Sequence, residues 1–401
     1  MRSKRILLCS ELGGGSGHIV CLRTIATALR DAGHEPTICV PSGTDKALLD
    51  TVRQFPILEK EKSAPLNSST GSSKTAPFKA ASFADVLGRI GFAEASTLMK
   101  QVKAWRDLFV GHQPDVVICD FSPTACFASH GIAPSLTVGN GYATPPSHLA
   151  YFPVLNARVA PTYSIGAISE NALSVAKHFG FAESLAATAL PRWIAGDRSF
   201  IRCFPQFDPY NSVRTQSVLG PLVSVGPIKR HVGNEWPFRF YAYLSANYPF
   251  IEQVIQGLCQ TTVPGDVFAG RLPLELRERL EASSLNVLAK APDWNDMLPR
   301  VSLVVHQSGL GTAQSCATAG VPQLVIPTHL EHELTSLAVL RLGIGAAIVP
   351  PFSAADVATG IERLLTKPAY RDAATKIAAQ FSSAGPSRFV EQVVDAVHAL
   401  S

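Results

Sequence analysis

Short apolar runs alternate with amphipathic stretches along the whole chain. The first run, Arg5–Ser10, has the length of a buried strand, and Leu22, Ile25, Ala26 and Leu29 then recur at the spacing of one helix face. The alternation of strand and helix continues toward the C-terminus. Because strands that alternate with helices form parallel sheets covered on both faces, the pattern predicts an α/β fold.

The remaining apolar runs predict two separate sets of strands. They lie at Thr37–Val40, Val116–Cys119 and Leu136–Val138, and then at Arg239–Leu244, Val267–Ala269, Ser302–His306, Gln323–Ile326 and Ala346–Val349. Helices are predicted between the later strands at residues 249–259, 274–280, from 311 onward, at 334–342 and, last, at Arg388–Leu400. We therefore expect two doubly wound domains with a cleft between them, and ligands beyond the carboxyl ends of the strands.

Composition marks where the domains meet. Residues 218–238 contain Gly-Pro twice and Trp-Pro once, which is typical of a linker. We therefore expect one domain at residues 1–217, a second at 239–385, and a final helical segment at 386–401. Residues 60–82 are rich in Ser, Thr, Lys and Ala, and this predicts a mobile surface loop.

The overall composition excludes several classes of protein. The chain has 401 residues, of which 46% are hydrophobic and 16% charged, and its net charge is +4. This argues against disorder and against nucleic-acid binding. Eight cysteines without a CxxC pair predict reduced, buried thiols in a cytoplasmic protein. No run approaches the ~20 apolar residues of a membrane span, although peripheral membrane contact stays open.

A glycine run follows the first predicted strand and opens the first helix. Gly13 to Gly17 is followed by His18, so the third glycine of a dinucleotide fingerprint is missing, and no acidic residue ends the second strand. Glycine lets a ligand approach the backbone closely. The helix dipole disfavours a positive charge on His18, which favours a neutral imidazole that accepts a proton. The structural alternative is a histidine that caps a turn.

Asp120 ends the buried run Val116–Cys119 and therefore points to the ligand-binding edge of the sheet. A carboxylate there could orient His18 and stabilise the imidazolium that forms when His18 takes a proton. The alternative is a helix N-cap, a role that suits Asp120 and Ser122 alike.

A second glycine-rich segment, His306 to Gln314, again lies between a strand and a helix. Free backbone N–H groups at a helix start form an anion site, and Gly309 and Gly311 would let a diphosphate come close. His306, Ser308 and Thr312 add side-chain donors. The alternative is an ordinary strand-to-helix turn.

The next strand is followed by Thr-His-Leu-Glu-His-Glu, residues 328–333. The spacing of its histidines fits neither zinc motif with two histidines on a helix, and no third ligand stands out, so we expect no metal. Hydrogen bonds to a sugar are the better interpretation. The chain also lacks an Asp-x-Asp, a common holder of Mg²⁺ on a nucleotide diphosphate. Helix N-termini and side chains must then meet the charge of the leaving group.

These motifs together resemble those of family 1 glycosyltransferases and of bacterial relatives of the peptidoglycan N-acetylglucosaminyltransferases. The similarity rests on Gly17-His18 and on His306 to Gln314, followed by Ala319-Gly320-Val321-Pro322-Gln323 and Glu331-His332. It implies a GT-B fold, two Rossmann-like domains with the last helix crossing back to the first. It also implies a hexosyltransferase-type enzyme of class EC 2.4 that inverts the sugar and needs no metal or other cofactor.

The resemblance assigns roles by position. His18 matches the catalytic base and Asp120 the acid that orients it. The donor-binding set is His306, Ser308, Gly309, Gly311, Thr312, Gln314, Glu331 and His332, and the acceptor-binding set is Gly17, Asn140 and Tyr142. Gln314 stands where many members carry a glutamate for the ribose, and His332 where they carry glutamine. The proline usual after Gly-His is replaced by Cys21.

The implied partners are a UDP- or dTDP-sugar and a small-molecule acceptor with a hydroxyl or other nucleophile, bound by a monomer or homodimer. Two other functions stay open: a transferase-like protein that binds without turnover, which Gln314 and His332 motivate, and a GT-B enzyme with a lipid-linked acceptor or of epimerase type. Trp294 is a poor match for the tryptophan that stacks on the base in this family, and the backbone near Pro292 is the preferred contact.

Overall fold

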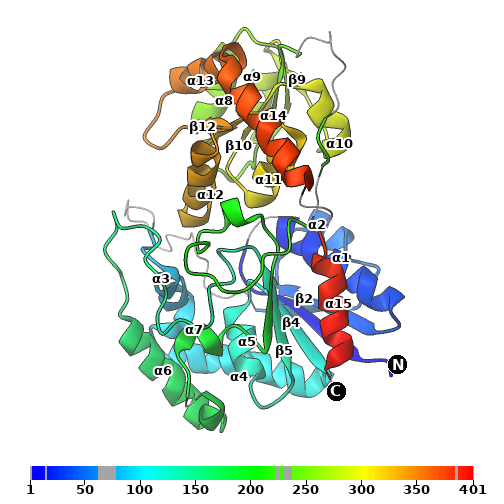
Figure 1. The fold of residues 1–401 in the computed structure, drawn as a ribbon, viewed down its shortest axis with the longest axis vertical. Coiled ribbons are helices and arrows are strands. Elements are labelled where there is room, and N and C mark those ends of the chain that lie inside the picture. The colour runs from blue at the N-terminus through cyan, green and yellow to red at the C-terminus, as the bar shows by residue number, and fades with distance from the viewer. Residues whose placement is uncertain are drawn as a thin grey trace. The chain divides into compact units, whose positions relative to one another are not determined.

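The computed structural model describes residues 2–13, 16–61, 78–185, 187–222, 225–228, 237–383 and 387–400. The chain divides into two compact units, Met1–Leu222 with Ser387–Ser401 and Val223–Pro386. Over the described residues, each unit holds one six-stranded sheet whose paired strands are all parallel (Figure 1). The predicted α/β fold with two doubly wound sheets is therefore confirmed.

The sheet of the N-terminal unit has the strand order β3-β2-β1-β4-β5-β6. Its strands are β1 (Arg5–Ser10), β2 (Glu35–Pro41), β3 (Ile57–Lys60), β4 (Val116–Asp120), β5 (Ser135–Gly139) and β6 (Arg198–Ile201). The helices of this unit are α1 (Ser16–Asp31), α2 (Lys46–Asp50), α3 (Phe83–Leu87), α4 (Ala95–His112), α5 (Pro123–Ser129), α6 (Ile165–His178), α7 (Leu190–Trp193) and α15 (Phe389–Ala399). Short 3-10 turns lie at Ala182–Leu185 and Pro205–Phe207, and a π-helical turn at Gly88–Phe92.

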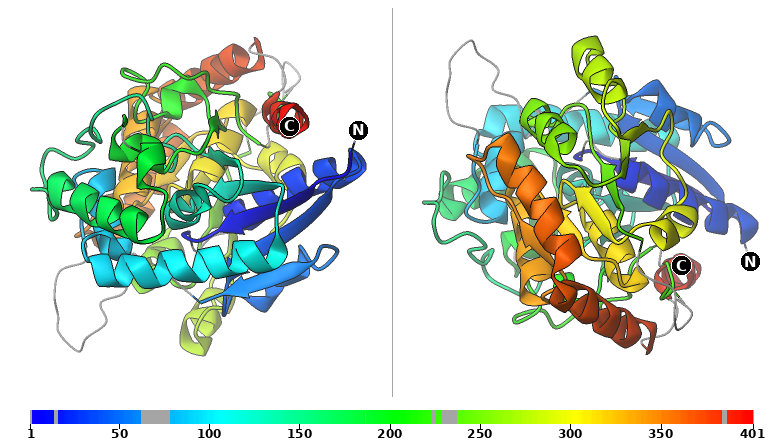
Figure 2. Two further views of the ribbon diagram at one scale, coloured as in Figure 1. Left: turned by 90° about the horizontal axis from the view of Figure 1, so that it is seen from below. Right: turned by 90° about the horizontal axis from the view of Figure 1, so that it is seen from above.

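Alternating strand residues bury opposite faces of this sheet. Ile6 and Leu8 of β1 belong to a core cluster with the apolar face of α1 and with Phe389 and Val393 of α15. On the other face, Cys119 of β4 lies against α5, and α5 packs on α4. The left panel of Figure 2 shows α4 and α15 on opposite sides of the sheet. The helix that ends the described chain thus completes the core of the N-terminal unit.

The sheet of the C-terminal unit has the order β12-β11-β10-β7-β8-β9. Its strands are β7 (Phe240–Tyr243), β8 (Gly265–Phe268), β9 (Asn286–Val287), β10 (Leu303–His306), β11 (Gln323–Val325) and β12 (Gly345–Ala347). Its helices are α8 (Ile251–Gln260), α9 (Leu274–Glu281), α10 (Trp294–Met297), α11 (Leu310–Ala319), α12 (Leu330–Arg341), α13 (Ala354–Thr366) and α14 (Pro368–Ser383), with a 3-10 turn at Leu298–Arg300. Helices α8 and α13 cover one face, and α10 and α11 cover the other.

The predicted surface loop at residues 60–82 needs correction at its ends. Residues 62–77 lie outside the described part of the chain, but Lys60 belongs to β3 and Ala80 to Ser82 are buried. Ser82 caps α3 and exchanges hydrogen bonds with Asp85 in a capping box. Backbone groups of a buried segment must be paired, and here Ala81 accepts from the N–H groups of Leu155 and Asn156.

Helix α12 begins at Leu330, four residues before the predicted start at 334. Its first turn therefore includes Glu331 and His332, which precede the predicted helix. In the described part of the chain, no helix has the length and apolar composition to cross a bilayer.

Candidate active site

The carboxyl ends of β1, β4, β5 and β6 meet at one edge of the N-terminal sheet. The pairing aligns Ser10 with Asp120 and Asp120 with Val138, and Gly139 with Ile201. Side chains that end these strands therefore gather at the edge where α1 begins. Asp120 and His18, far apart in the sequence, are neighbours there.

His18 and Asp120 form a direct pair. The Nδ1 atom of His18 lies 3.0 Å from Oδ1 of Asp120, and the Asp120 side chain is fully buried while the His18 side chain is 14% exposed. An ionised carboxylate can only accept a hydrogen bond, so Nδ1 carries the proton and donates it. The other ring nitrogen, Nε2, is then a proton acceptor on a partly exposed side chain.

Asp120 stays ionised although it is buried. Burial opposes the charge, but the adjacent His18 and Arg202 outweigh it and hold the pKa of the Asp120 carboxyl below its usual range. The Nη2 atom of Arg202 lies 3.7 Å from Oδ2 of Asp120. Opposite charges at this distance favour the charged form of a carboxyl. The sequence analysis did not find Arg202, which directly follows the short strand β6, whereas Asp120 is the last residue of β4.

The N-cap interpretation is wrong for Asp120 and holds for Ser122 in position only. Asp120 belongs to β4, and Ser122 stands at the cap position of α5 without a side-chain hydrogen bond to the helix. The Ser122 hydroxyl donates instead to the carbonyl oxygens of Cys9 and Asp120, at 3.0 and 3.1 Å. Ser122 therefore ties the end of β4 to β1 and fixes the backbone that carries the carboxylate.

The glycine before α1 makes room for the histidine ring. Gly13 has φ of +94°, and a Cβ atom placed on it would lie 2.4 Å from Cδ2 of His18. Any other residue would displace the ring or the loop. Gly17 differs, because a Cβ placed there would meet nothing within 4 Å. Gly14 and Gly15 lie outside the described residues.

Aromatic side chains pack behind His18. The Phe121 ring stacks on His18 with 5.8 Å between centroids, and Phe121 has a positive φ of 48°. Tyr142, predicted to bind the acceptor, is 8% exposed and packs edge-on against Phe121 and Phe83. Asn140, also predicted to bind the acceptor, is buried and its Oδ1 accepts from the N–H of Ala143. In this structure both residues shape the turn after β5.

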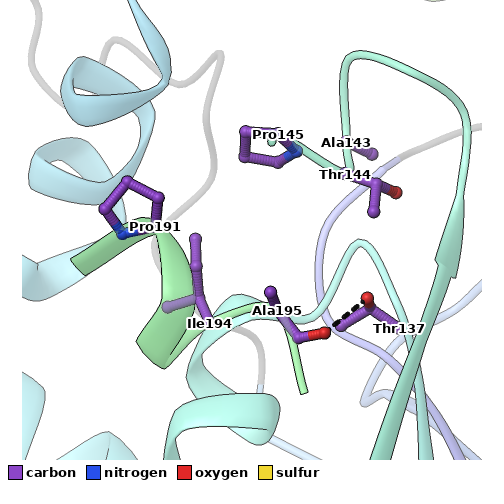
Figure 3. Close-up of a pocket in the computed structure, with 7 residues that line it drawn as sticks. All are labelled: Thr137, Ala143, Thr144, Pro145, Pro191, Ile194 and Ala195. Carbon is purple, nitrogen blue, oxygen red and sulfur yellow. Dashed lines mark hydrogen bonds between the residues drawn. The ribbon is translucent and has the colours of Figure 1, made fainter. Parts of the chain in front are cut away.

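A small cavity lies near this turn, between the end of β5 and α7 (Figure 3). Its volume is about 10 Å³, and Thr137 on its wall donates a hydrogen bond to the carbonyl of Ala195 at 2.8 Å. A space of this size holds about one water molecule. It is therefore not a binding site for a sugar or an acceptor.

The second candidate region lies at the carboxyl edge of the C-terminal sheet, where β10 ends. His306 is 1% exposed; its Nδ1 accepts from the N–H of Ser308 at 3.1 Å, and Nε2 lies 2.9 Å from Oε1 of Gln323. Since an amide oxygen only accepts, Nε2 donates. Burial lowers the pKa of His306 to about 4, although the bond to Gln323 opposes the shift. The ring is therefore neutral, and both nitrogens are engaged within the unit.

Two of the three predicted side-chain donors to a diphosphate, His306 and Ser308, are buried and hydrogen-bonded within the unit in this structure. Besides His306, Ser308 is fully buried, and its Oγ lies 2.8 Å from Oγ of Ser336 in α12. Ser308 has a positive φ of 66°, so it forms the sharp turn into α11. Gln314, predicted to bind the ribose, is only 2% exposed.

The backbone at the start of α11 is open. Gly309 is the N-cap residue of α11, and a Cβ placed on Gly309 or Gly311 would meet nothing within 4 Å. Thr312 is half-buried in the first turn. The missing side chains leave the N–H groups of this turn accessible to a ligand, which is the arrangement that binds anions at helix starts.

Two histidines stand together at the start of α12. The rings of His329 and His332 are 3.8 Å apart between centroids, and Thr328 Oγ1 lies 3.2 Å from Nδ1 of His332. Burial lowers the pKa of both, against the effect of Glu331 and Glu333 on His329. They therefore act as neutral hydrogen-bonding groups. Among the described residues, no group of three His, Cys, Asp or Glu side chains could hold a metal ion.

Trp294, considered above for base stacking, is half-buried at the start of α10. Its ring packs edge-on against Tyr241 and Tyr243 of β7, at 5.7 and 5.4 Å. The ring thus belongs to the packing of this unit.

Comparisons with known proteins find a matching family and similar curated proteins over parts of the chain. Residues 277–397 match the family described as Erythromycin biosynthesis protein CIII-like, C-terminal domain. The chain is 36% identical to the elloramycin glycosyltransferase ElmGT of Streptomyces olivaceus over 94 residues, 23% of each chain. It is 27% identical to the aclacinomycin-T 2-deoxy-L-fucose transferase of Streptomyces galilaeus over 179 residues, 43% of this chain and 38% of that protein. These alignments span less than half the length of either relative.

Solved structures match the chain over its whole length. The calicheamicin glycosyltransferase CalG4 aligns with a TM-score of 0.67 and 15% identity, over 100% of this chain and 98% of that chain. The glycosyltransferase VinC, in complex with dTDP, aligns with a TM-score of 0.65 and 17% identity, over 99% of both chains. At these identities the likeness shows the fold, which is the predicted GT-B fold.

Proposed function

We propose that this chain, which has the GT-B glycosyltransferase fold and, at residues 277–397, an erythromycin-CIII-like C-terminal domain, transfers a sugar from a nucleoside diphosphate to a small-molecule acceptor. The family match over residues 277–397 and the fold shared with solved glycosyltransferases support the proposal. The observation that carries the proposal is the pairing of His18 with the ionised Asp120 at the carboxyl edge of the N-terminal sheet.

The pair fits the chemistry of a general base. Nε2 of His18 takes the proton of the acceptor hydroxyl while the acceptor oxygen forms a bond to the anomeric carbon of the sugar. The bond from that carbon to the diphosphate oxygen breaks, and its electrons leave with the diphosphate. Asp120 stabilises the resulting imidazolium, because a buried carboxylate 3.0 Å from Nδ1 favours the charged form of the His18 ring. Attack opposite the leaving group inverts the anomeric centre.

The donor is proposed to bind at the start of α11. The diphosphate lies against the open backbone at Gly309 and Gly311, and the helix dipole together with Thr312 meets its charge without a metal. His306 and Ser308 hold the shape of this loop, and Glu331 with His332 faces the sugar. Two of the solved glycosyltransferases that share this fold hold dTDP (thymidine diphosphate), which favours a dTDP-sugar over a UDP-sugar as donor. Relatives named for deoxysugar transfer favour a deoxyhexose.

The test combines binding with turnover. Purified protein is titrated calorimetrically with dTDP and UDP, and then incubated with the corresponding sugar nucleotides and a panel of hydroxylated small molecules, with products detected by mass spectrometry. We expect dTDP to bind more tightly than UDP and a glycoside to form with wild type but not with His18→Gln. Binding of dTDP without any glycoside across the panel would favour the non-catalytic binding protein instead.

A further inference from the structure

Arg202 stands against the candidate catalytic pair on the side away from His18. It follows β6 directly, and its backbone N–H donates to the carbonyl of Gly139 at 2.8 Å. Its side chain is 11% exposed, and its guanidinium lies 3.7 Å from Oδ2 of Asp120, while His18 binds Oδ1. One buried carboxylate therefore has a cation on one oxygen and a titratable ring on the other.

The two partners of Asp120 differ in an important way. A guanidinium is always charged at physiological pH, whereas an imidazole gains and loses its proton there. A buried carboxylate with His18 as its sole partner would need the imidazolium to balance its charge, because an unpaired buried charge is costly. With Arg202 beside it, Asp120 is already balanced when His18 is neutral.

We propose that Arg202 is a positioning residue that fixes the charge of Asp120 and thereby keeps His18 in its neutral, proton-accepting form at rest. The inference rests on the proposed function, in which His18 is the base. The site is then a triad, His18–Asp120–Arg202, built from α1, β4 and the residue after β6. The guanidinium also repels a proton on the ring, so its charge lowers the proton affinity of His18.

The other ionisable groups around the triad do not replace Arg202. Cys21, a residue of α1, lies beside Asp120. Burial raises the pKa of the Cys21 thiol well above the usual value, so the thiol stays uncharged. Burial likewise raises the pKa of Cys203 to about 12. Asp208 and Arg214 form their own two-point ion pair. Glu11, directly after β1, accepts from the N–H of Thr124 at 3.0 Å.

The experiment measures the pKa of His18 directly. Protein with isotope-labelled histidine is titrated by NMR, and the His18 signal among the 11 histidines is assigned as the one lost in His18→Gln. We expect Arg202→Met, which keeps the aliphatic stem without the charge, to raise the pKa of His18 by about one unit. Arg202→Lys, which keeps the charge, should leave it within about 0.3 unit of wild type.

A pKa of His18 that is unchanged or lower in Arg202→Met, with wild-type circular dichroism, would overturn the proposal. Arg202→Gln gives the same comparison should Arg202→Met not fold. Because the titration needs no substrate, it decides the role of Arg202 even where no glycoside is formed. Where transfer is observed, the acid limb of its pH profile should move upward by the same amount in Arg202→Met and return in Arg202→Lys.

Discussion

His18 and His306 both lie at the carboxyl edge of a parallel sheet beside a glycine-rich turn, His18 in the first turn of α1 and His306 at the end of β10, and their surroundings differ sharply. His18 is partly exposed and pairs with a carboxylate, whereas His306 is buried and pairs with the amide of Gln323. A carboxylate stabilises the imidazolium and so lets a histidine take a proton. A neutral amide in a buried site does not, and there the histidine serves as a fixed link in a hydrogen-bonded turn.

The hydrogen-bond partner therefore distinguishes the two roles: a carboxylate suits a histidine that takes a proton, and an amide suits a histidine that holds a turn in shape. The same contrast extends to the glycines. The space that a Cβ atom on Gly13 would take is occupied by the ring of His18, whereas the same space at Gly309 and Gly311 is open. The N-terminal turn thus positions one side chain, and the C-terminal turn keeps side chains away from its backbone.

The largest effect is expected at His18. Replacing it with glutamine should slow transfer about 100- to 10,000-fold, the usual contribution of a general base, and leave the affinity for dTDP unchanged, since the donor is proposed to bind the other unit. The check is the transfer rate against a calorimetric titration of the same sample. A rate within a few-fold of wild type would remove His18 from the mechanism.

The pH dependence of stability should report His306. Its pKa in the folded protein is about 4, below the ordinary 6.5, so the neutral ring stabilises the fold above pH 6.5 and this contribution is lost as the pH falls toward 4. The loss is about 3 kcal/mol of unfolding free energy.

Urea unfolding at a series of pH values measures this loss. His306→Asn should remove that part of the pH dependence, while costing about 1–3 kcal/mol at pH 7 because Gln323 and the Ser308 N–H lose their partner. The exposed His178 provides the matched control, since His178→Asn should change neither quantity. An unaltered pH slope in His306→Asn would contradict the assignment of a buried neutral ring.

A smaller effect is expected at Gly13. Gly13→Ala places a methyl group against the ring of His18 in a backbone conformation that disfavours side chains, so we expect roughly 1–2 kcal/mol of lost stability and at least ~10-fold slower transfer through the displaced base. Gly111→Ala in α4, where a Cβ meets nothing within 4 Å, is the control. If Gly13→Ala and Gly111→Ala had the same melting temperature and the same transfer rate, the space at Gly13 would not be needed for the ring of His18.

The smallest effect on the fold is expected at Gly311. Alanine is a better helix former, so Gly311→Ala should raise the unfolding free energy by about 0.5–1 kcal/mol. The same methyl group would stand where the diphosphate is proposed to lie, and the affinity for dTDP should fall about tenfold. If Gly311→Ala is more stable and binds dTDP as tightly as wild type, the donor does not bind at the start of α11.

Much of the fold could be predicted because its signals are local. Apolar runs such as those of β1, β4 and β10 are read from neighbouring residues, and parallel sheets place their carboxyl ends together, which brought His18 and Asp120 into one hypothesis. Short strands gave no such signal, and β9, of two residues, was not predicted. Helices α4 and α6 were also left unassigned.

The rest of the site depends on packing between distant segments. The burial of His306 follows from Gln323 and Ser308, and whether a side chain turns inward or outward at a strand end is decided by the elements that cover it. Arg202 lies 82 positions after Asp120 in the printed sequence, and neither residue alone shows that β6 will pair with β5. Its place beside the carboxylate is a property of the assembled sheet.

The packing of α15 has a consequence for the order in which the protein is made. Phe389, Val393 and Val397 belong to the core beneath α1, and Lys4 donates hydrogen bonds to the carbonyls of Val397 and Leu400. The N-terminal unit therefore cannot close its core until α15 has been synthesised, which happens after the whole of the unit from Val223 to Pro386. That unit has its own sheet and core, and all of its residues precede α15 in the chain, so its core can close before the core of the N-terminal unit.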